Sequence, residues 1–245
     1  MAHVQVHADG IELDDPVLVE GLPGIGLVGK IAADHLVNAL DMEYYASCHC
    51  EGLPRVAVYH ADDPGTLPPV RFYADEARDL LVLQSDVPVS PSSASEFAAC
   101  VTGWLVDNEV FPVYLSGLPS DKGDVPQMYG VATGGGAEVL AEHGIDDPPE
   151  NGVVSGPTGA LLYQAARQGL DGTGLVVEAS AQFPDPEAAR VLLRKGVGPI
   201  AGVEVDTEEL VEKAEEISQA REQLAKQMQQ ADDESSRAQP IRGFQ

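Results

Sequence analysis

The hydrophobic and polar positions of this chain form short apolar runs that alternate with segments of helical spacing. The clearest case lies in residues 17–40, where the apolar run 17–19 meets a turn rich in Gly and Pro. Apolar residues follow at helical spacing, at Leu27, Ile31, Leu36 and Leu40. The stretch predicts a strand, a glycine turn and a helix, which is the opening unit of an α/β domain.

The same reading predicts further strands and helices along the chain. Strands are expected at residues 3–7, 43–50, 55–59, 70–74, 79–84, 111–115, 128–132 and 174–179. Helices are expected after Ser92 or Ser93, over residues 134–143 and from Asp185, and Val153-Val154 predicts a second strand, turn and helix ending at Gly169. Strands that alternate with helices imply a mostly parallel sheet between helical layers, and the runs in 43–74 indicate hairpins near a sheet edge.

The C-terminal region has a different composition. We expect one domain over residues 1–206, a helix over 207–233 with no Gly or Pro, and a flexible tail over 234–245. Apolar residues in the helix alternate at spacings of four and three, the pattern of a coiled coil of about three heptads. Its oligomer seam would comprise Leu210, Ile217, Leu224 and Met228. The alternative is an amphipathic helix that folds back onto its own domain.

The glycine turn matches the fingerprint of dinucleotide-binding proteins. Gly24, Gly26 and Gly29 have the required spacing, and Asp41 or Glu43 would be the acid that binds the ribose. Alone, this match is a weak signal. The competing interpretation is that the glycines lack a Cβ so that the helix can pack closely on the strand.

A second nucleotide-binding template, the P-loop, falls on the same turn. Gly24 and Gly29-Lys30 have its spacing, but Ile31 stands where the magnesium-binding Ser or Thr should be. The apolar periodicity already includes Leu27, which predicts that Lys30 lies one turn inside the helix. We therefore expect no cofactor.

The net charge excludes one class of partner. The 245 residues include 40 acidic and 14 basic side chains, a formal net charge of −26. Nucleic acid would be repelled, because affinity for phosphate backbones depends on Lys and Arg. An acidic, lysine-poor surface is typical of proteins from concentrated salt, where self-repulsion is screened, so we infer a salt-loving source organism.

Three cysteines are an odd and sparse set, which favours a reducing compartment and argues against a disulfide framework. Cys48-His49-Cys50 would need about two more ligands to hold zinc, and its alternation equally suits two side chains on one face of a strand, so we expect no metal site. The chain shows neither a signal peptide nor an apolar run of about 20 residues, which predicts a soluble, cytoplasmic protein without membrane contact.

The sequence gives little support for catalysis. Ser155, Thr158 and Ser180 lie near turns, and His35, His60 and His143 lie elsewhere. A hydrolytic triad could be assembled from them only by free choice, and the Gly-x-Ser-x-Gly elbow is missing. We expect no catalytic residues.

Four ordered blocks resemble the proteasome assembly chaperone 2 (PAC2) family in its archaeal form. They are GLPGIGLVGKIAADHL, YLSGLPS, GVVSGPTGALL and LVVEASAQFPDPEAARVLL, and the match as a whole covers about residues 17–197. The resemblance implies a three-layer α/β/α sandwich, homo-oligomerisation and a non-enzymatic role as a chaperone or scaffold in proteasome assembly or binding. The alternative is a nucleotide- or small-molecule-binding protein, or an enzyme, that uses the Gly21–Gly29 loop.

The resemblance also implies a role for the last residues. Proteins that dock on the end of the 20S proteasome often finish in a hydrophobic residue, Tyr and any residue. This chain ends in Gly243-Phe244-Gln245, which keeps a penultimate aromatic ring but lacks the hydroxyl and one apolar anchor. We expect Phe244 and the carboxylate of Gln245 to contribute to partner binding.

Overall fold

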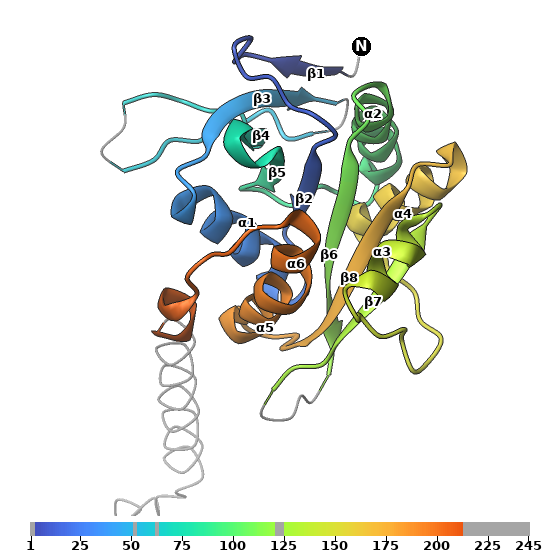
Figure 1. The fold of residues 1–245 in the computed structure, drawn as a ribbon. Helices are drawn as coiled ribbons and strands as arrows, with labels where there is room; N and C mark the ends of the chain where they lie inside the picture. Colours follow the sequence, from blue (N-terminus) through green and yellow to red (C-terminus); the bar gives the residue numbers. More distant parts are fainter. Residues whose placement is uncertain (1–2, 51–52, 62–63, 121–124, 213–245) are drawn as a thin grey trace, which may run out of the picture.

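The computed structural model describes residues 3–50, 53–61, 64–120 and 125–212, which form an α/β fold around one eight-stranded sheet (Figure 1). The strands are β1 His3–Val6, β2 Val17–Gly21, β3 Glu43–His49, β4 Val70–Asp75, β5 Leu80–Ser85, β6 Phe111–Pro119, β7 Met128–Thr133 and β8 Gly172–Ala179. They lie in the order β1-β3-β4-β5-β2-β6-β8-β7.

The helices follow the predicted positions closely. They are η1 Ile25–Leu27, α1 Val28–Ala39, η2 Glu76–Arg78, α2 Ala94–Asp107, α3 Gly136–Glu142, α4 Gly156–Gln168, α5 Pro186–Leu192, the π-helix η3 Leu193–Val197 and α6 Gly198–Ala201. The predicted helix starts at Ser93 and Asp185 are confirmed, and the Asp185 carboxylate accepts a hydrogen bond from the Ala188 amide. A short polar side chain at this position satisfies an amide that the helix itself leaves free.

The prediction of a mostly parallel sheet is wrong. Of the seven pairings between described strands, β2–β5, β2–β6 and β6–β8 are parallel and the other four are antiparallel. Antiparallel neighbours need no crossover helix. The consecutive strands β3, β4 and β5 pair in this way, which confirms the expected hairpins toward one edge, and β7 pairs antiparallel with β8 at the other edge.

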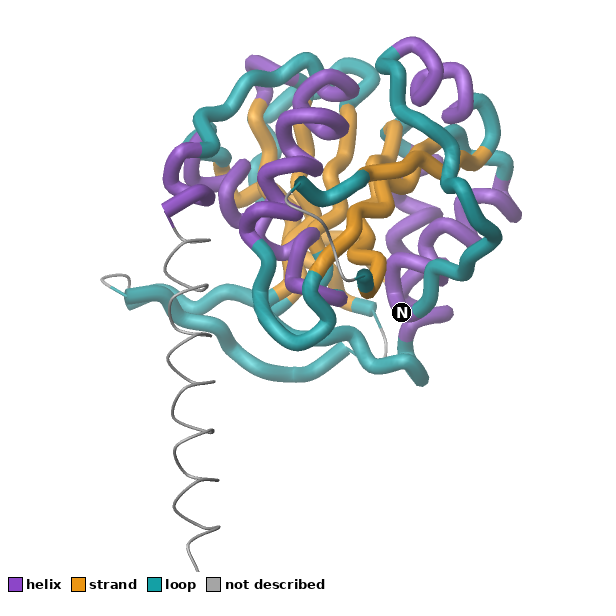
Figure 2. Tube along the Cα trace, turned by 90° about the horizontal axis from the view of Figure 1, so that it is seen from below, coloured by secondary structure: helices purple, strands orange, loops and turns teal. Residues whose placement is uncertain are grey.

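Buried side chains form two clusters, one on each face of the sheet. Leu18 and Val19 are consecutive on β2 and belong to different clusters, because side chains alternate along a strand. Helices α1 and α5 contribute to the cluster of Val19, and α2 and α4 to that of Leu18. Figure 2 accordingly shows the strands between helices.

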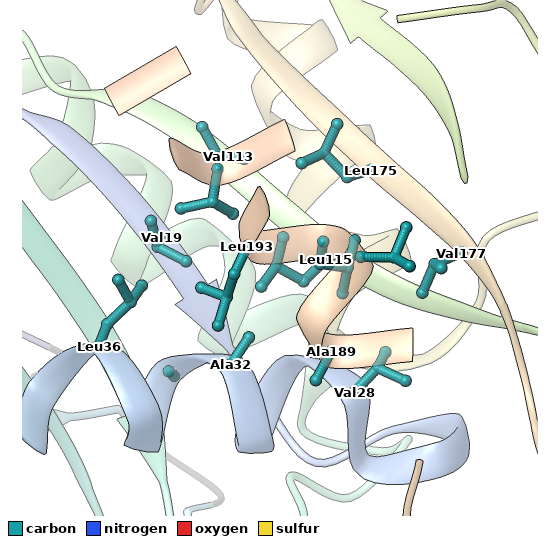
Figure 3. Packing of buried hydrophobic residues seen from close by; sticks show 14 of the residues in the cluster. Val19, Val28, Ala32, Leu36, Val113, Leu115, Leu175, Val177, Ala189 and Leu193 are labelled. Carbon is teal, nitrogen blue, oxygen red and sulfur yellow. The ribbon is translucent and has the colours of Figure 1, made fainter. Parts of the chain in front are cut away.

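The packing of α1 explains why this segment is a helix. Val28, Ala32 and Leu36 recur every four residues, are at most 1% exposed, and face Val19 and Leu115 of the sheet (Figure 3). The small side chain of Ala32 lets the helix axis approach the strands. The predicted helix is confirmed, but of the four apolar positions named from the sequence only Leu36 is fully buried, and Leu27 precedes the helix.

Two predicted strands do not form. Residues 55–59 contribute only an isolated bridge between Val58 and Leu67. Val153 is 91% exposed and precedes α4 without pairing to the sheet. Two β-branched residues between polar and Gly neighbours are too short a run to compete for a place in the sheet.

Among the described residues, no helix has the length and apolar character needed to cross a bilayer.

Candidate functional site

The parallel strands β5, β2, β6 and β8 end at the same edge of the sheet, where ligand sites of open α/β sheets are usually found. The turn between β2 and α1 lies at this edge. Gly26 and Leu27 both adopt left-handed backbone conformations, with φ of 62° and 51°. A non-glycine residue rarely adopts this conformation, and such residues concentrate at functional sites.

The glycines of the turn allow close packing. A Cβ on Gly21 would lie 2.0 Å from the Cβ of Ala33, so α1 can cross β2 at this distance only because residue 21 is glycine. A Cβ on Gly29 would lie 3.3 Å from the Leu22 carbonyl oxygen, whereas one on Gly24 would meet nothing within 4 Å. Steric packing therefore accounts for two of these three glycines and leaves Gly24 unexplained.

Lys30 corrects one prediction about the helix start. Leu27 precedes the helix, so α1 begins at Val28 and Lys30 lies in its first turn, closer to the P-loop arrangement than expected. Its ammonium group nevertheless pairs with Asp34 at 2.7 Å and with Asp86 at 3.3 Å. The charge that would hold a phosphate is thus engaged by two carboxylates.

Asp86 links Lys30 to a second cation inside the domain. The side chain of Arg71 is fully buried, and its guanidinium donates to Asp86 at 2.5 Å and to the hydroxyl of Tyr73 at 2.8 Å. Burial opposes ionisation of Asp86, but the hydrogen bond and charge of Arg71, together with Lys30, lower the pKa of this carboxyl overall. The network holds β4, the end of β5 and α1 together.

Glu20, at the end of β2, is a fully buried carboxylate. Its oxygens accept hydrogen bonds from the amide of Leu22 at 3.2 Å, the amide of Leu115 at 3.1 Å and the hydroxyl of Thr158 at 3.0 Å. Burial raises its pKa to about 7, although these three hydrogen bonds oppose the rise. Glu20 therefore joins the glycine turn, β6 and α4.

A hollow of about 480 Å³ lies between the glycine turn and residues 181–184. Its described lining residues, Gly24, Ile25, Gly26, Leu27, Ala181, Gln182, Phe183 and Pro184, carry no charge. Ile25 and Leu27 are each 37% exposed beside it. An uncharged, largely apolar hollow suits side chains of another protein better than a phosphate.

The candidate catalytic side chains do not gather into a triad. Thr158 binds Glu20, and the His35 ring nitrogen lies 2.6 Å from the carbonyl oxygen of Asp206. The ring of His60 instead lies 3.4 Å from the Arg71 guanidinium. These residues connect structural elements.

The cysteines correct another expectation. Cys50 and Cys100 form a disulfide, although the sequence argued against disulfide pairing. They are 50 residues apart and meet because α2 packs beside the end of β3, a contact that spacing along the chain cannot reveal. Cys48 is free and buried.

The predicted tail sites fall mostly outside the described residues. Leu210 is the exception, and it is 1% exposed within the core of its own chain, so this first seam position packs within the domain. The sites outside are Ile217, Leu224, Met228, Phe244 and Gln245.

Sequence reasoning missed Glu20 and the Arg71–Asp86 pair. A signal for Glu20 was present, because a carboxylate inside the apolar run VLVEG must be hydrogen-bonded or neutralised when the strand is buried. Arg71 and Asp86 carried no such signal, since their pairing depends on the antiparallel register of β4 and β5.

Comparisons with known proteins agree with this architecture. The chain is 30% identical over 220 residues to MJ0106, an uncharacterized protein of Methanocaldococcus jannaschii, covering 89% of this chain and 88% of that protein. The crystal structure of PbaA of Pyrococcus furiosus, an archaeal homolog of proteasome-assembly chaperone, is similar with a TM-score of 0.77 and 26% identity, covering 94% of this chain and 99% of PbaA.

PbaB of Pyrococcus furiosus, an archaeal proteasome activator, has the same fold, with a TM-score of 0.73 and 24% identity over 92% of this chain and all of PbaB. The model of the PAC2 family matches residues 18–225. That match contains the glycine turn, Glu20, the Arg71–Asp86 pair and all of the parallel strands except the first residue of β2. This protein belongs to the PAC2 family.

Proposed function

We propose that this chain is a non-enzymatic, oligomeric chaperone or scaffold that binds proteasome subunits during assembly or on the finished particle. The observation that carries the proposal is the similarity to PbaA, which extends over 94% of this chain at a TM-score of 0.77. PbaA is an archaeal homolog of proteasome-assembly chaperone. We also infer that the helices on the two faces of the sheet form the three-layer sandwich of this class.

The sheet edge supports protein binding over nucleotide binding. The hollow between the glycine turn and residues 181–184 has an uncharged lining, and Ile25 and Leu27 present apolar side chains beside it. Lys30 is held by Asp34 and Asp86. We propose that Ile25, Leu27 and the hollow, together called the turn surface, contact a proteasome subunit.

The C-terminal region would supply two further contacts. We propose that residues 207–233 continue as a helix that joins subunits through Ile217, Leu224 and Met228. We further propose that Phe244 and the carboxylate of Gln245 add to proteasome binding. Because the terminal tripeptide lacks one apolar anchor, we assign the larger share of the affinity to the turn surface.

Co-sedimentation with purified 20S proteasomes in molar salt tests the turn surface. Leu27→Asp places a charge on it without a backbone penalty, because Asp tolerates the left-handed conformation of residue 27. Val106→Asp is the matched control, since Val106 is 40% exposed near the end of α2, at the opposite edge of the sheet. Loss of binding by the Leu27 variant alone is expected, whereas equal binding by both variants would refute the assignment.

Truncation separates the contributions of the tail. Deleting residues 243–245 should weaken co-sedimentation, and unchanged binding would exclude a role for Phe244. Light scattering of the full chain and of a chain ending at residue 212 should show a larger assembly for the full chain. A monomeric full chain would refute the oligomeric scaffold.

Calorimetry with ATP and NAD addresses the rival interpretation. We expect no binding, because the Leu22 amide is already bound by Glu20 and Lys30 is paired. Micromolar affinity that Gly26→Val abolishes would favour a ligand-binding protein instead.

A further inference from the structure

The three cysteine sulphurs gather at one end of the sheet. Cys48 lies on β3, Cys50 follows the last residue of this strand, and Cys100 comes from α2. The Cys48 thiol lies 3.1 Å from the sulphur of Cys50, which is bonded to Cys100. All three sulphurs lie within 4.8 Å of one another.

We propose that in the reduced chain Cys48, Cys50 and Cys100 form a binding site for a single soft, thiophilic metal ion of the Cu(I) class. The disulfide between Cys50 and Cys100 is then the metal-free, oxidised state of the same site. This site is independent of the proteasome contacts proposed above.

The distances between the sulphurs suit one shared ion. A metal–sulphur bond of about 2.3 Å requires sulphurs about 3.8–4.0 Å apart in trigonal or tetrahedral geometry. The sulphurs of Cys48 and Cys50 lie 3.1 Å apart, and no two of the three sulphurs are more than 4.8 Å apart, so small side-chain rotations would reach these values. The 6.3 Å between the Cα atoms of Cys50 and Cys100 leaves room for their sulphurs to separate in this way. Reduction therefore converts the cluster into a ligand set with little movement of the backbone.

The ligand set selects the class of metal. Soft thiolates favour Cu(I), zinc and iron–sulphur clusters, whereas Mg²⁺ and Ca²⁺ require oxygen ligands. Structural zinc takes four ligands, but among the described residues no further His, Cys, Asp or Glu joins the three sulphurs. Three sulphurs without a fourth ligand fit trigonal Cu(I).

The neighbouring His49 is not part of the set. Consecutive residues of a strand point to opposite faces, so the His49 ring lies on the other side of β3 from Cys48. There its Nε2 lies 2.8 Å from the Ser47 hydroxyl, and the ring stacks on His3 at 5.3 Å. The linear motif Cys-His-Cys thus gives two ligands, and the third comes from α2.

The surroundings of the cluster protect the site from hard cations and water. Cys48 and Cys50 are 4% and 7% exposed within an apolar cluster that includes Phe72, while Cys100 is partly exposed and offers an entry. Metal binding at thiols displaces their protons, so loading of the site should release protons to solvent.

Loading of the oxidised chain begins with reduction. A dithiol reductant supplies two electrons and two protons to the Cys50–Cys100 bond, which gives two thiols and converts the reductant to its own disulfide. Cu(I) then binds the three sulphurs, and the thiol protons that it displaces pass to solvent. The metal keeps its oxidation state in this step.

The test is an anaerobic titration of the reduced full chain with Cu(I) against the competing chelator bicinchoninate, in sulphate medium because chloride also binds Cu(I). Cys48→Ser, Cys48→Ala and Cys100→Ser remove ligands one at a time. His49→Ala is the control that retains all three sulphurs. Circular dichroism of each variant checks that it folds. The oxidised wild-type chain is a second control, which removes two ligands without any mutation.

We expect one Cu(I) per reduced chain and a thiolate-to-copper absorption band in the ultraviolet. Binding should be at least about tenfold weaker in each cysteine variant, because loss of a ligand should cost no less than loss of a group that only orients a ligand. The His49 variant should bind like the wild type, and the oxidised chain should not bind. No binding by the reduced wild type, binding unaffected by Cys48→Ala, or binding of Zn(II) in preference to Cu(I) would each overturn the proposal.

Discussion

Replacing Glu20 with Gln should remove a specific part of the pH dependence of stability. Glu20 is 0% exposed, and its burial raises the pKa from 4.5 to about 7. Between these values the unfolded chain releases this proton while the folded chain keeps it. The free energy of unfolding therefore falls as pH rises through this window. Above the window, the loss of stability caused by ionising Glu20 stays constant.

The size of this change in the free energy of unfolding follows from the pKa shift of Glu20. A displacement of about 2.5 pKa units corresponds to about 3 kcal/mol, of which about 2.5 kcal/mol develops between about pH 5 and about pH 8. Gln at this position does not titrate. It also places an amide donor where Glu20 accepts three hydrogen bonds, which destabilises the variant by an amount that does not depend on pH. The informative quantity is therefore how the difference in free energy of unfolding between wild type and variant changes with pH.

Urea titrations in molar salt from about pH 5 to about pH 8 measure this difference. The stability of the wild type relative to Glu20→Gln should fall by about 2.5 kcal/mol across the range. Thr158→Val should move the fall to higher pH, because it removes a hydrogen bond that lowers the pKa of Glu20. Glu142→Gln on α3 controls for the loss of one surface charge. Parallel curves for the wild type and Glu20→Gln would refute the reasoning.

Three further substitutions test the interactions around the turn. Gly26→Ala should destabilise the fold by about 1–3 kcal/mol in the same urea titration, because residue 26 has a φ of 62° and the new Cβ would lie 3.0 Å from the Cβ of Ala179. Unchanged stability would show that the turn can relax. Asp86→Asn should lower the free energy of unfolding by about 3 kcal/mol, because it leaves the Arg71 guanidinium without its carboxylate. Because the pKa of Asp86 is lowered in the folded chain, acidification of the wild type should remove this same contribution to stability. A difference between variant and wild type that is equal at low and neutral pH would contradict this. Tyr114→Phe should leave thermal stability unchanged or raise it by up to about 1 kcal/mol, since the buried hydroxyl has no hydrogen-bond partner among the described residues; a large loss would reveal one.

Local sequence patterns predicted most elements of the fold. The helical spacing of Leu27, Ile31, Leu36 and Leu40 predicted α1, although Leu27 precedes it, and Asp185 marked the start of α5. Helix periodicity and capping depend on residues close together in the chain. The predicted strand at 153–154 failed because membership of a sheet depends on a partner strand. The antiparallel direction of β7 could not be derived for the same reason.

In the candidate site, too, the local features could be predicted from the sequence and the long-range contacts could not. The glycine turn was found from the sequence, yet two motif templates could not show that its glycines serve packing against Ala33 and Leu22. Lys30 entered only the alternative nucleotide-binding interpretation, because motifs record spacing. Of its two carboxylate partners, Asp34 is four residues away but Asp86 is 56 residues away. Electrostatic partners at such separations are invisible to local reasoning.

The sequence by itself determined the α/β class, the strand, turn and helix at residues 17–40, and the resemblance to the PAC2 family, since all of these depend on local order along the chain. Tertiary structure alone decided the mixed sheet, the raised pKa of Glu20, the burial of Leu210 in its own domain and the meeting of Cys100 with Cys48 and Cys50. Each of these depends on which distant segments pack together, and packing sets burial, hydrogen bonding and charge at once.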